Sequence, residues 1–256
     1  MIKRRGTRAV RVGNIIIGGG APVSIQEMTS TRTEDVKETV AQIKSLKRAG
    51  CELVRVAVPN KEAAKALKEI KSNIDIPLIA DIHFDYRLAI MAAESGVDKL
   101  RINPGNIGGR EKVAEVAKAA KKYEIPIRIG VNSGSIQKEI YEKYGGATPE
   151  AMVESALFEI ELLEDFGFKD IVVSLKSSDV KTTVKAYQLL ADKVDYPFHI
   201  GITEAGYGRA GTVKSVVGIG ILLFHGLGDT VRVSLTSRNP VFSIKVARSI
   251  LTELGY

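Results

Sequence analysis

The segment Ile125-Pro126-Ile127-Arg128-Ile129-Gly130-Val131-Asn132, residues 125–132, contains the pattern that decides the fold. Pro126 favours an extended backbone before it, and apolar residues then alternate with Arg128, Gly130 and Asn132. Successive side chains of a strand point to opposite faces, so the apolar residues take one face and the cation takes the other. Residues 127–132 are therefore predicted to form a strand with helices against its apolar face.

Four more segments place one cation among apolar residues in the same way: Leu53-Val54-Arg55-Val56, Leu100-Arg101-Ile102, Val173-Ser174-Leu175-Lys176 and Val231-Arg232-Val233. If helices pack on the apolar face of one common sheet, the cations of all five strands converge on its other face. Converging charges in a protein interior require an anion to offset them.

The same periodicity predicts eight strands separated by helical patterns. The strands are expected at residues 23–26, 53–58, 78–82, 99–103, 127–132, 171–176, 198–203 and 230–235. The helices are expected at residues 33–49, 61–72, 86–95, 110–123, 148–166, 179–194, 211–225 and 240–254. Eight alternating βα units in 256 residues predict an α/β fold of the (β/α)8 TIM barrel class, with an open doubly wound sheet as the alternative.

The glycine triplet Gly18-Gly19-Gly20 argues against the open sheet. A doubly wound sheet usually carries its phosphate-binding glycine loop after the first strand, whereas this triplet precedes the first strand and opens no helix. It is instead predicted to end a short hairpin, residues 9–12 and 14–17, that covers the bottom of the barrel. Residues 1–256 are expected to form a single TIM-barrel domain, with residues 1–20 as an N-terminal hairpin.

The composition narrows the class of partner. The chain has a formal net charge of +7, but it has no Lys/Arg block and no Trp, and only 6% of its residues are aromatic. Nucleic acid is therefore a weaker explanation of the basic balance than a phosphorylated small molecule. No signal peptide is visible, and no stretch approaches the ~18 apolar residues of a membrane span. A cytoplasmic protein without membrane contact is expected.

The chain contains one cysteine, Cys51, and three scattered histidines. One cysteine excludes an internal disulfide and cannot by itself hold a metal ion or an iron–sulfur cluster. Its position just before a strand predicts a small core residue. No transition-metal site built from this chain alone is predicted.

Active sites of TIM barrels lie at the C-terminal ends of the strands, and the five cations lie at or near those ends. Polar side chains share their faces, namely Asn103, Asn132, Ser174 and Ser234. Guanidinium groups bind phosphate oxygens in pairs, while amides and hydroxyls add further donors. The predicted ligand is an anion with more than one negative charge.

An internal salt-bridge network is the alternative explanation of the cations. The carboxylates at comparable positions are Asp81 and Glu204. Five cations outnumber these two carboxylates, and isolated buried charges are strongly destabilising, so the network is disfavoured. His83 follows Asp81 by two residues and is predicted to be a ligand donor or a proton carrier, while Glu204 is the best acid–base candidate. His199 is expected in the core.

Eight motifs in these strands and their exits carry a resemblance to a known family. They are QEMT (26–29), VRVAV (54–58), ADIHFDYR (80–87), LRINPGN (100–106), IRIGVN (127–132), SLKSSD (174–179), GITEAG (201–206) and DTVRVSL (229–235). Through them the sequence resembles, over nearly its whole length, the bacterial 4-hydroxy-3-methylbut-2-enyl diphosphate synthase family.

The resemblance implies an oxidoreductase of the methylerythritol phosphate route to isoprenoids, which opens 2-C-methyl-D-erythritol 2,4-cyclodiphosphate by two-electron reductive dehydration. It implies that five cations grip the cyclic diphosphate, namely Arg55, Arg101, Arg128, Lys176 and Arg232. It assigns supporting contacts to four polar residues, namely Asn103, Asn132, His83 and Ser234. Glu204 would handle protons near the reacting carbons, and Asp81 would orient a cation or a substrate hydroxyl.

The family also implies a cofactor and partners. Its four-iron four-sulfur cluster is held by three cysteines and a glutamate in a second domain that follows the barrel, and reduced flavodoxin or ferredoxin supplies electrons. Two chains pair, so a homodimer is expected. Because this chain has only Cys51 and ends just after its eighth helix, it is expected to be the barrel alone, truncated or engineered, that binds substrate without turnover.

Some residues depart from the family pattern. Glu27 stands where a small polar residue is usual, and alternation predicts that only one of Gln26 and Glu27 faces the anion site. Phe224, His225 and Phe242 stand on the last helices at positions that are usually more polar. They indicate either helix packing or a redesigned or oligomeric contact surface.

Two other functions remain open on the sequence alone. One is a self-sufficient, metal-free barrel enzyme for a phosphorylated or pterin substrate, with Glu204 and His83 as acid and base. The other is an engineered, non-catalytic scaffold that assembles through its helical surface.

Overall fold

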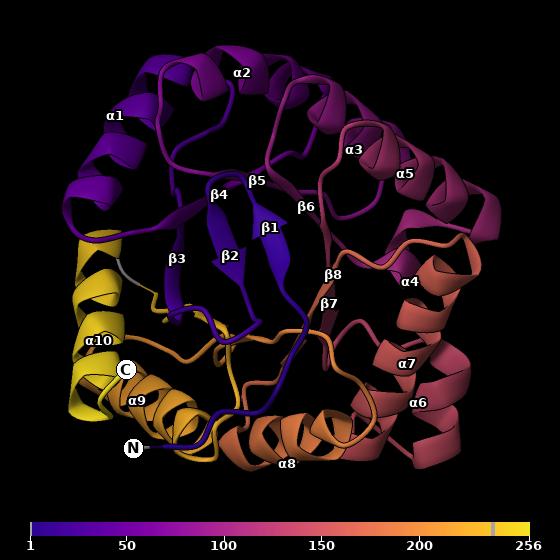
Figure 1. Ribbon diagram of the computed structural model, residues 1–256, viewed down its shortest axis with the longest axis vertical. Coiled ribbons are helices and arrows are strands. Elements are labelled where there is room, and N and C mark those ends of the chain that lie inside the picture. The colour runs from indigo at the N-terminus through magenta and orange to yellow at the C-terminus, as the bar shows by residue number, and fades with distance from the viewer. Residues whose placement is uncertain (1, 237–238) are drawn as a thin grey trace.

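Figure 1 shows the chain in a computed structural model that describes residues 2–236 and 239–256. Eight parallel strands alternate with helices and form a barrel with the helices around it. The strands are β3 (Ser24–Met28), β4 (Leu53–Ala57), β5 (Leu78–Asp81), β6 (Lys99–Ile102), β7 (Ile127–Asn132), β8 (Ile171–Lys176), β9 (His199–Ile200) and β10 (Thr230–Val231).

The barrel closes between β8 and β9. Val173 pairs with Phe198 there, and the Val173 N–H donates to the Pro197 carbonyl at 3.0 Å. Together with the ladder from β8 through β3 to β9, this pairing gives each of the eight strands two neighbours. The predicted (β/α)8 TIM barrel is confirmed, and the open doubly wound sheet is excluded.

Strands β9 and β10 are shorter than predicted. Each contains two residues, whereas the sequence pattern predicted residues 198–203 and 230–235. The Arg232 N–H still donates to the Ile200 carbonyl at 3.0 Å, just past the assigned strands. At the next residue, a Cβ on Gly201 would lie 2.5 Å from the Arg232 carbonyl oxygen. The two segments therefore approach too closely for any side chain at position 201.

The helices that surround the barrel lie within three residues of their predicted bounds. They are α1 (Val36–Arg48), α2 (Lys61–Ser72), α3 (Tyr86–Glu94), α5 (Arg110–Lys122), α7 (Pro149–Asp165), α8 (Val180–Ala191), α9 (Gly208–Phe224) and α10 (Pro240–Glu253). Two short helices were not predicted: α4 (Pro104–Ile107), which follows β6, and α6 (Lys138–Tyr144), which follows β7. None of the helices in the described ranges is long and apolar enough to cross a membrane.

The predicted N-terminal hairpin is formed by β1 (Val10–Val12) and β2 (Ile15–Ile17). Its side chains Val10, Val12 and Ile17 form a buried apolar cluster with Leu53, Ile79 and Val172, which stand at or near the beginnings of barrel strands. The hairpin lies across the barrel in Figure 1. The hairpin covers the N-terminal end of the barrel, as predicted, which leaves the C-terminal ends of the strands for a ligand.

Apolar side chains fill the layer between strands and helices, whereas much of the barrel interior is polar. On β6, Leu100 and Ile102 belong to the apolar core, while Lys99 and Arg101 are buried on the opposite face. Burial of the apolar layer is the main favourable contribution to folding. Burial of charged side chains such as Lys99 and Arg101 in the barrel interior is unfavourable by itself, so it indicates a functional role for the interior.

Candidate functional site

A pocket of about 260 Å³ lies at the C-terminal ends of the barrel strands. Its lining residues are Met28, Arg55, Asp81, His83, Arg101, Arg128, Asn132, Ser174, Lys176, Thr203, Arg232 and Ser234. All the predicted site residues except Asn103 and Glu204 are among them. The fold thus brings the cations of five separate strand segments together at one opening.

Asp81, at the end of β5, organises one side of the pocket. Its Oδ1 accepts from Arg101 Nη1 at 3.1 Å, and its Oδ2 lies 3.7 Å from Arg55 Nε and 3.2 Å from His83 Nε2. Burial alone would raise the pKa of Asp81, but Arg55, His83 and Arg101 together hold it below its usual range. The ionised carboxylate therefore fixes the direction of two guanidinium groups.

Glu27, on β3, is the second carboxylate that pairs with a pocket cation. It is buried, and its Oε1 accepts from Arg232 Nε at 2.8 Å. The neighbouring Gln26 accepts from Arg128 Nη1 at 3.3 Å. Neither side chain lines the strand-end pocket, so the expectation that only one of them faces a bound anion stays a prediction. Arg232 reaches Glu27 because β10 and β3 are neighbouring strands, with Val231 paired to Ile25.

Arg128 and Lys176 form no ion pair within the described residues. Arg128 is 1% exposed and Lys176 is 7% exposed. Burial first, and then the surrounding guanidinium groups, lowers the pKa of both side chains. Burial likewise lowers the pKa of Arg55 to about 10. These buried cations are electrostatically unfavourable until an anion enters.

Two glycines make room for the cationic side chains. A Cβ on Gly130 would lie 2.5 Å from Arg101 Nε, and a Cβ on Gly201 would lie 3.2 Å from Lys176 Nζ. Van der Waals contact does not permit the first distance, so Gly130 is required for the observed position of Arg101. These glycines therefore allow cations, rather than only a ligand, to approach the backbone.

Two polar residues that were not predicted to belong to the site, Lys99 and His199, lie inside the barrel. Lys99 lies on the same face of β6 as Arg101, two residues later. This spacing could have predicted that Lys99 also points into the barrel. Lys99 Nζ and both ring nitrogens of His199 have no hydrogen-bond partner in the part of the chain that the structure describes. Burial, followed by neighbouring cations, lowers the pKa of Lys99 and of His199. The expectation that His199 lies in the core is confirmed.

Asn103 stands behind the pocket wall. Its Nδ2 donates to Ser135 Oγ at 2.8 Å and lies 3.4 Å from the Gly130 carbonyl. Ser135 Oγ in turn accepts from the Asn132 N–H at 2.9 Å. Since Asn132 lines the pocket, Asn103 connects to the pocket through the segment that follows β7.

Glu204 lies at the rim with its side chain exposed, next to the lining residue Thr203. It does not pair with the pocket cations, so its expected place among them was wrong for this conformation. Its backbone φ is +47°, a region that non-glycine residues occupy at a free-energy cost of about 1 kcal/mol or more. The sharp turn after β9 holds the carboxylate away from the pocket.

The cations and carboxylates of the site do not balance. Two carboxylates, Asp81 and Glu27, pair with three of the five predicted cations, and the excess is three positive charges within the described residues. Such an excess in a small polar pocket suits a ligand with several anionic oxygens.

Cys51 does not fit an iron–sulfur cluster. It is the only cysteine in the sequence, it is buried, and its Sγ contacts the Leu53 carbonyl oxygen at 3.1 Å. Burial raises the pKa of its thiol to about 12, so the thiol stays protonated, whereas cluster ligation requires several thiolates. No group of three or more His, Cys, Asp or Glu residues suits a metal ion in residues 2–236 and 239–256.

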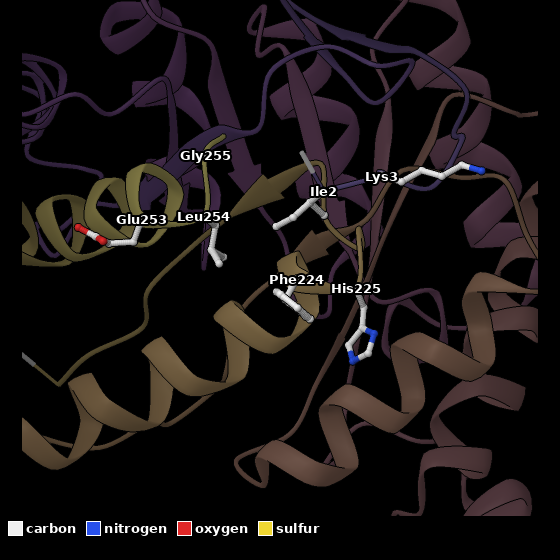
Figure 2. A pocket seen from close by; sticks show the side chains of 7 residues that line it. All are labelled: Ile2, Lys3, Phe224, His225, Glu253, Leu254 and Gly255. Carbon is white, nitrogen blue, oxygen red and sulfur yellow. The ribbon is translucent and has the colours of Figure 1, made fainter.

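A larger hollow, of about 730 Å³, lies among the N-terminal segment and the C-terminal ends of α9 and α10. Figure 2 shows Ile2, Phe224 and Leu254 around it, with the amino group of Lys3 pointing away. It lacks the converging cations of the strand-end pocket. Phe224 is 65% exposed and Phe242 is 46% exposed, so simple helix packing does not account for these two side chains.

Comparison with known proteins identifies close relatives. Residues 7–248 match the family described as the GcpE TIM-barrel domain. The chain is 59% identical over 256 residues to 4-hydroxy-3-methylbut-2-en-1-yl diphosphate synthase (flavodoxin) of Caldanaerobacter subterraneus subsp. tengcongensis, covering 100% of this chain and 72% of the relative. The synthase of the same name in Fusobacterium nucleatum is 59% identical over 250 residues, covering 98% of this chain and 70% of the relative.

Solved structures with a similar fold have little sequence similarity. A type I 3-dehydroquinate dehydratase of Clostridium difficile superposes with a TM-score of 0.69 at 21% identity, covering 97% of this chain and 98% of that one. A dihydropteroate synthase of Yersinia pestis superposes with a TM-score of 0.64 at 10% identity, covering 97% and 99%. At such identities the likeness shows the barrel fold alone.

Proposed function

Since this chain belongs to the 4-hydroxy-3-methylbut-2-en-1-yl diphosphate synthase family, as its GcpE TIM-barrel domain, we propose that the strand-end pocket binds 2-C-methyl-D-erythritol 2,4-cyclodiphosphate. The observation that carries the proposal is the pair of buried cations Arg128 and Lys176, which form no ion pair in the described ranges. A compact cyclic diphosphate brings two negative charges and several acceptor oxygens. It would offset most of the excess charge in the pocket.

Each group of pocket residues has a role in this proposal. Arg128 and Lys176 hold the phosphoryl oxygens from below, and Arg232, with Ser234 3.1 Å from its Nη1, holds them from the side. Arg55 and Arg101 are aimed by Asp81 and complete the ring of donors. Asn132 and Ser174 line the same space and add neutral donors.

The reaction that this barrel would serve opens the cyclic diphosphate and removes one hydroxyl as water, with two electrons from a reductant. The cations stabilise the charge that develops on the diphosphate as the ring carbon–oxygen bond breaks. His83, hydrogen-bonded to Asp81, is the proposed proton donor within the pocket wall. Glu204 would take part only after the turn at the rim brings its side chain inward.

The electrons would come from outside this chain. The names of the relatives specify flavodoxin as the reductant, and we propose the same partner, or a ferredoxin, for the protein in which this barrel acts. An iron–sulfur cluster would supply these electrons and bind the hydroxyl oxygen that the substrate loses, but Cys51 alone cannot provide its ligands. These 256 residues alone are expected to bind substrate without turnover.

We also propose that the protein forms a homodimer. It is proposed to be cytoplasmic and to bind neither nucleic acid nor membranes. Helix α9 exposes an apolar row at helical spacing, namely Val213, Val216, Val217, Ile221 and Phe224. Exposed apolar rows of this kind are typical of association surfaces. Sedimentation equilibrium of the wild type and of Val217→Lys should show a dimer that the substitution weakens, whereas two equal monomers would contradict this contact.

Calorimetric titration with the cyclodiphosphate tests the proposed function. A preformed buried site should bind one cyclodiphosphate per chain. Sulfate should not reproduce this binding, and moderate salt should weaken it only in part. Lys176→Met should weaken binding about tenfold or more, since it removes a buried cation that the ligand pairs with. Exposed Lys118→Met on α5 is the control. No binding, with clean self-association, would favour the scaffold function instead.

A further inference from the structure

Glu159, on α7, is a fully buried carboxyl group that the proposed reaction does not use. It does not line the strand-end pocket. Fully buried carboxyl groups usually pair with a cation, because burial of an isolated charge is strongly unfavourable. Glu159 forms no ion pair with any of the described residues.

Glu159 lies near two other polar side chains that surround Gly105. A Cβ built on Gly105 would lie 3.2 Å from Asn103 Oδ1, 3.2 Å from Gln137 Nε2 and 3.4 Å from Glu159 Oε1. These side chains come from the end of β6, from the start of α6 and from α7. The cluster therefore joins three segments that are distant in the sequence.

The cluster has more acceptors than donors. Gln137 Nε2 donates to Glu159 Oε1 at 3.3 Å. Glu159 Oε2, Asn103 Oδ1 and Gln137 Oε1 are buried and have no hydrogen-bond partner in the described part of the chain. An ionised carboxylate would add one more unpaired acceptor and a charge, whereas a protonated carboxyl adds a donor.

The surroundings of Glu159 favour the protonated form. Burial raises the pKa of Glu159 to about 8, although the Gly105 amide, the Arg101 guanidinium and the Gln137 amide each lower it. Arg101 is the charged group that faces Glu159, and it pairs directly with Asp81 instead.

The cluster connects to the pocket through hydrogen bonds. Asn103 Nδ2 donates to Ser135 Oγ at 2.8 Å, and the Asn132 N–H donates to the same oxygen at 2.9 Å. Asn132 lines the pocket. Ser135 therefore joins Asn103 to the pocket wall, and Gln137, the partner of Glu159, follows Ser135 by two residues.

We propose that Glu159 is a positioning residue: its uncharged carboxyl, hydrogen-bonded to Gln137, holds the start of α6 beside the segment after β6, and its ionisation loosens the pocket wall and weakens ligand binding. The inference rests on the proposed function, because the affected ligand is the cyclic diphosphate. The substitution Glu159→Gln distinguishes the effect of ionisation from that of side-chain size. The glutamine amide keeps the size of the side chain and a hydrogen-bond donor, but it does not ionise.

The first experiment measures affinity for 2-C-methyl-D-erythritol 2,4-cyclodiphosphate between pH 6.5 and pH 9.5. Each phosphorus of this ligand has a single acidic hydroxyl that is already ionised at pH 6.5, so the charge of the ligand stays constant. The wild type should lose about five- to tenfold in affinity across the range, and Glu159→Gln should lose less. Burial also lowers the pKa of Lys176, but any effect of this on affinity is the same in both proteins. Parallel profiles would overturn the inference.

A second measurement separates this inference from the proposed function. Hydrogen exchange of the amides in residues 103–108 and 133–137 is compared between the unliganded wild type and Glu159→Gln. The ratio of rates should be close to one at pH 6.5 and about tenfold at pH 9, with faster exchange in the wild type. Exposed Glu161→Gln on the same helix is the control. A shift in this ratio in a protein that does not bind the ligand would support the positioning role of Glu159 and contradict only the proposed function, whereas an unchanged ratio would refute the positioning role.

Discussion

Lys99→Met should stabilise the protein, because Lys99 is buried in the barrel without a hydrogen-bond partner in the described residues. Burial, then Arg128 and Arg55, lowers the pKa of Lys99 well below 10.5. Methionine has a similar length and no polar group at its end. Removal of an unsatisfied buried donor is worth about 1–3 kcal/mol. In a chain of this size, that corresponds to a rise in the melting temperature of about 2–10 °C.

The pH dependence of this gain follows from the direction of the pKa shift. Below pH 10.5, the unfolded wild type binds a proton at Lys99 that the folded protein binds less readily. The stability contributed by this site therefore falls as pH decreases, and it recovers as pH rises towards 10.5. The free energy of unfolding of Lys99→Met lacks this dependence on pH. The variant should therefore exceed the wild type in stability by more at pH 6 than at pH 10.

Urea denaturation, monitored by circular dichroism at pH 6, 8 and 10, measures both effects. Lys99→Ala controls for volume, since it leaves a cavity and should lose part of the gain. Exposed Lys118→Met controls for loss of a charge. If Lys99→Met were less stable than the wild type at pH 6, Lys99 would be charged and held by a buried anion or water, and the reasoning would be refuted.

Three further substitutions test the site and its supports. Arg128→Met should weaken binding of the cyclodiphosphate by about 2 kcal/mol or more while the urea midpoint stays or rises, because it removes a buried cation with no carboxylate partner; a lower midpoint with unchanged affinity would contradict the assignment. Gly130→Ala should destabilise the fold by about 1–3 kcal/mol and weaken binding, since the new Cβ would lie 2.5 Å from Arg101 Nε, whereas Gly134→Ala, with no atom within 4 Å, should do neither. Glu159→Gln should raise the unfolding free energy by about 3 kcal/mol at pH 7 and by little at pH 4.5. The folded protein holds the proton of Glu159 up to about pH 8, whereas the unfolded chain releases it near pH 4.5, so wild-type stability falls between these values; equal differences at pH 4.5 and pH 7 would show that the carboxyl is ionised in the fold.

The barrel and most of the strand-end pocket could be predicted because strand and helix periods are local properties. The alternation around Arg55, Arg101 and Arg128 depends only on neighbouring residues, and these side chains do line one pocket. Lys99 carried the same signal two residues before Arg101, so its burial inside the barrel was within reach of the sequence. The helices α4 and α6 were missed because segments of four and seven residues are too short to show a period.

The pairing of charges could not be predicted, because it depends on which strands are neighbours in the barrel and on the distances between their side chains. Glu27 pairs with Arg232 across 205 residues of sequence, because β3 and β10 are neighbours in the closed barrel. Glu204 was expected inside, but a turn with φ of +47° carries it to the rim. Asn103 was expected in the pocket, but its hydrogen bonds place it behind the wall.

The sequence by itself determined the barrel and the convergence of cations on its interior, because both follow from the alternation of side chains along each strand. Only the tertiary structure decided which cations are neutralised, which form no ion pair in the described residues, and that Glu159 is buried beside the segment after β6. These outcomes depend on distances between residues brought together by closure of the barrel, and electrostatic interactions in a buried site change steeply with such distances.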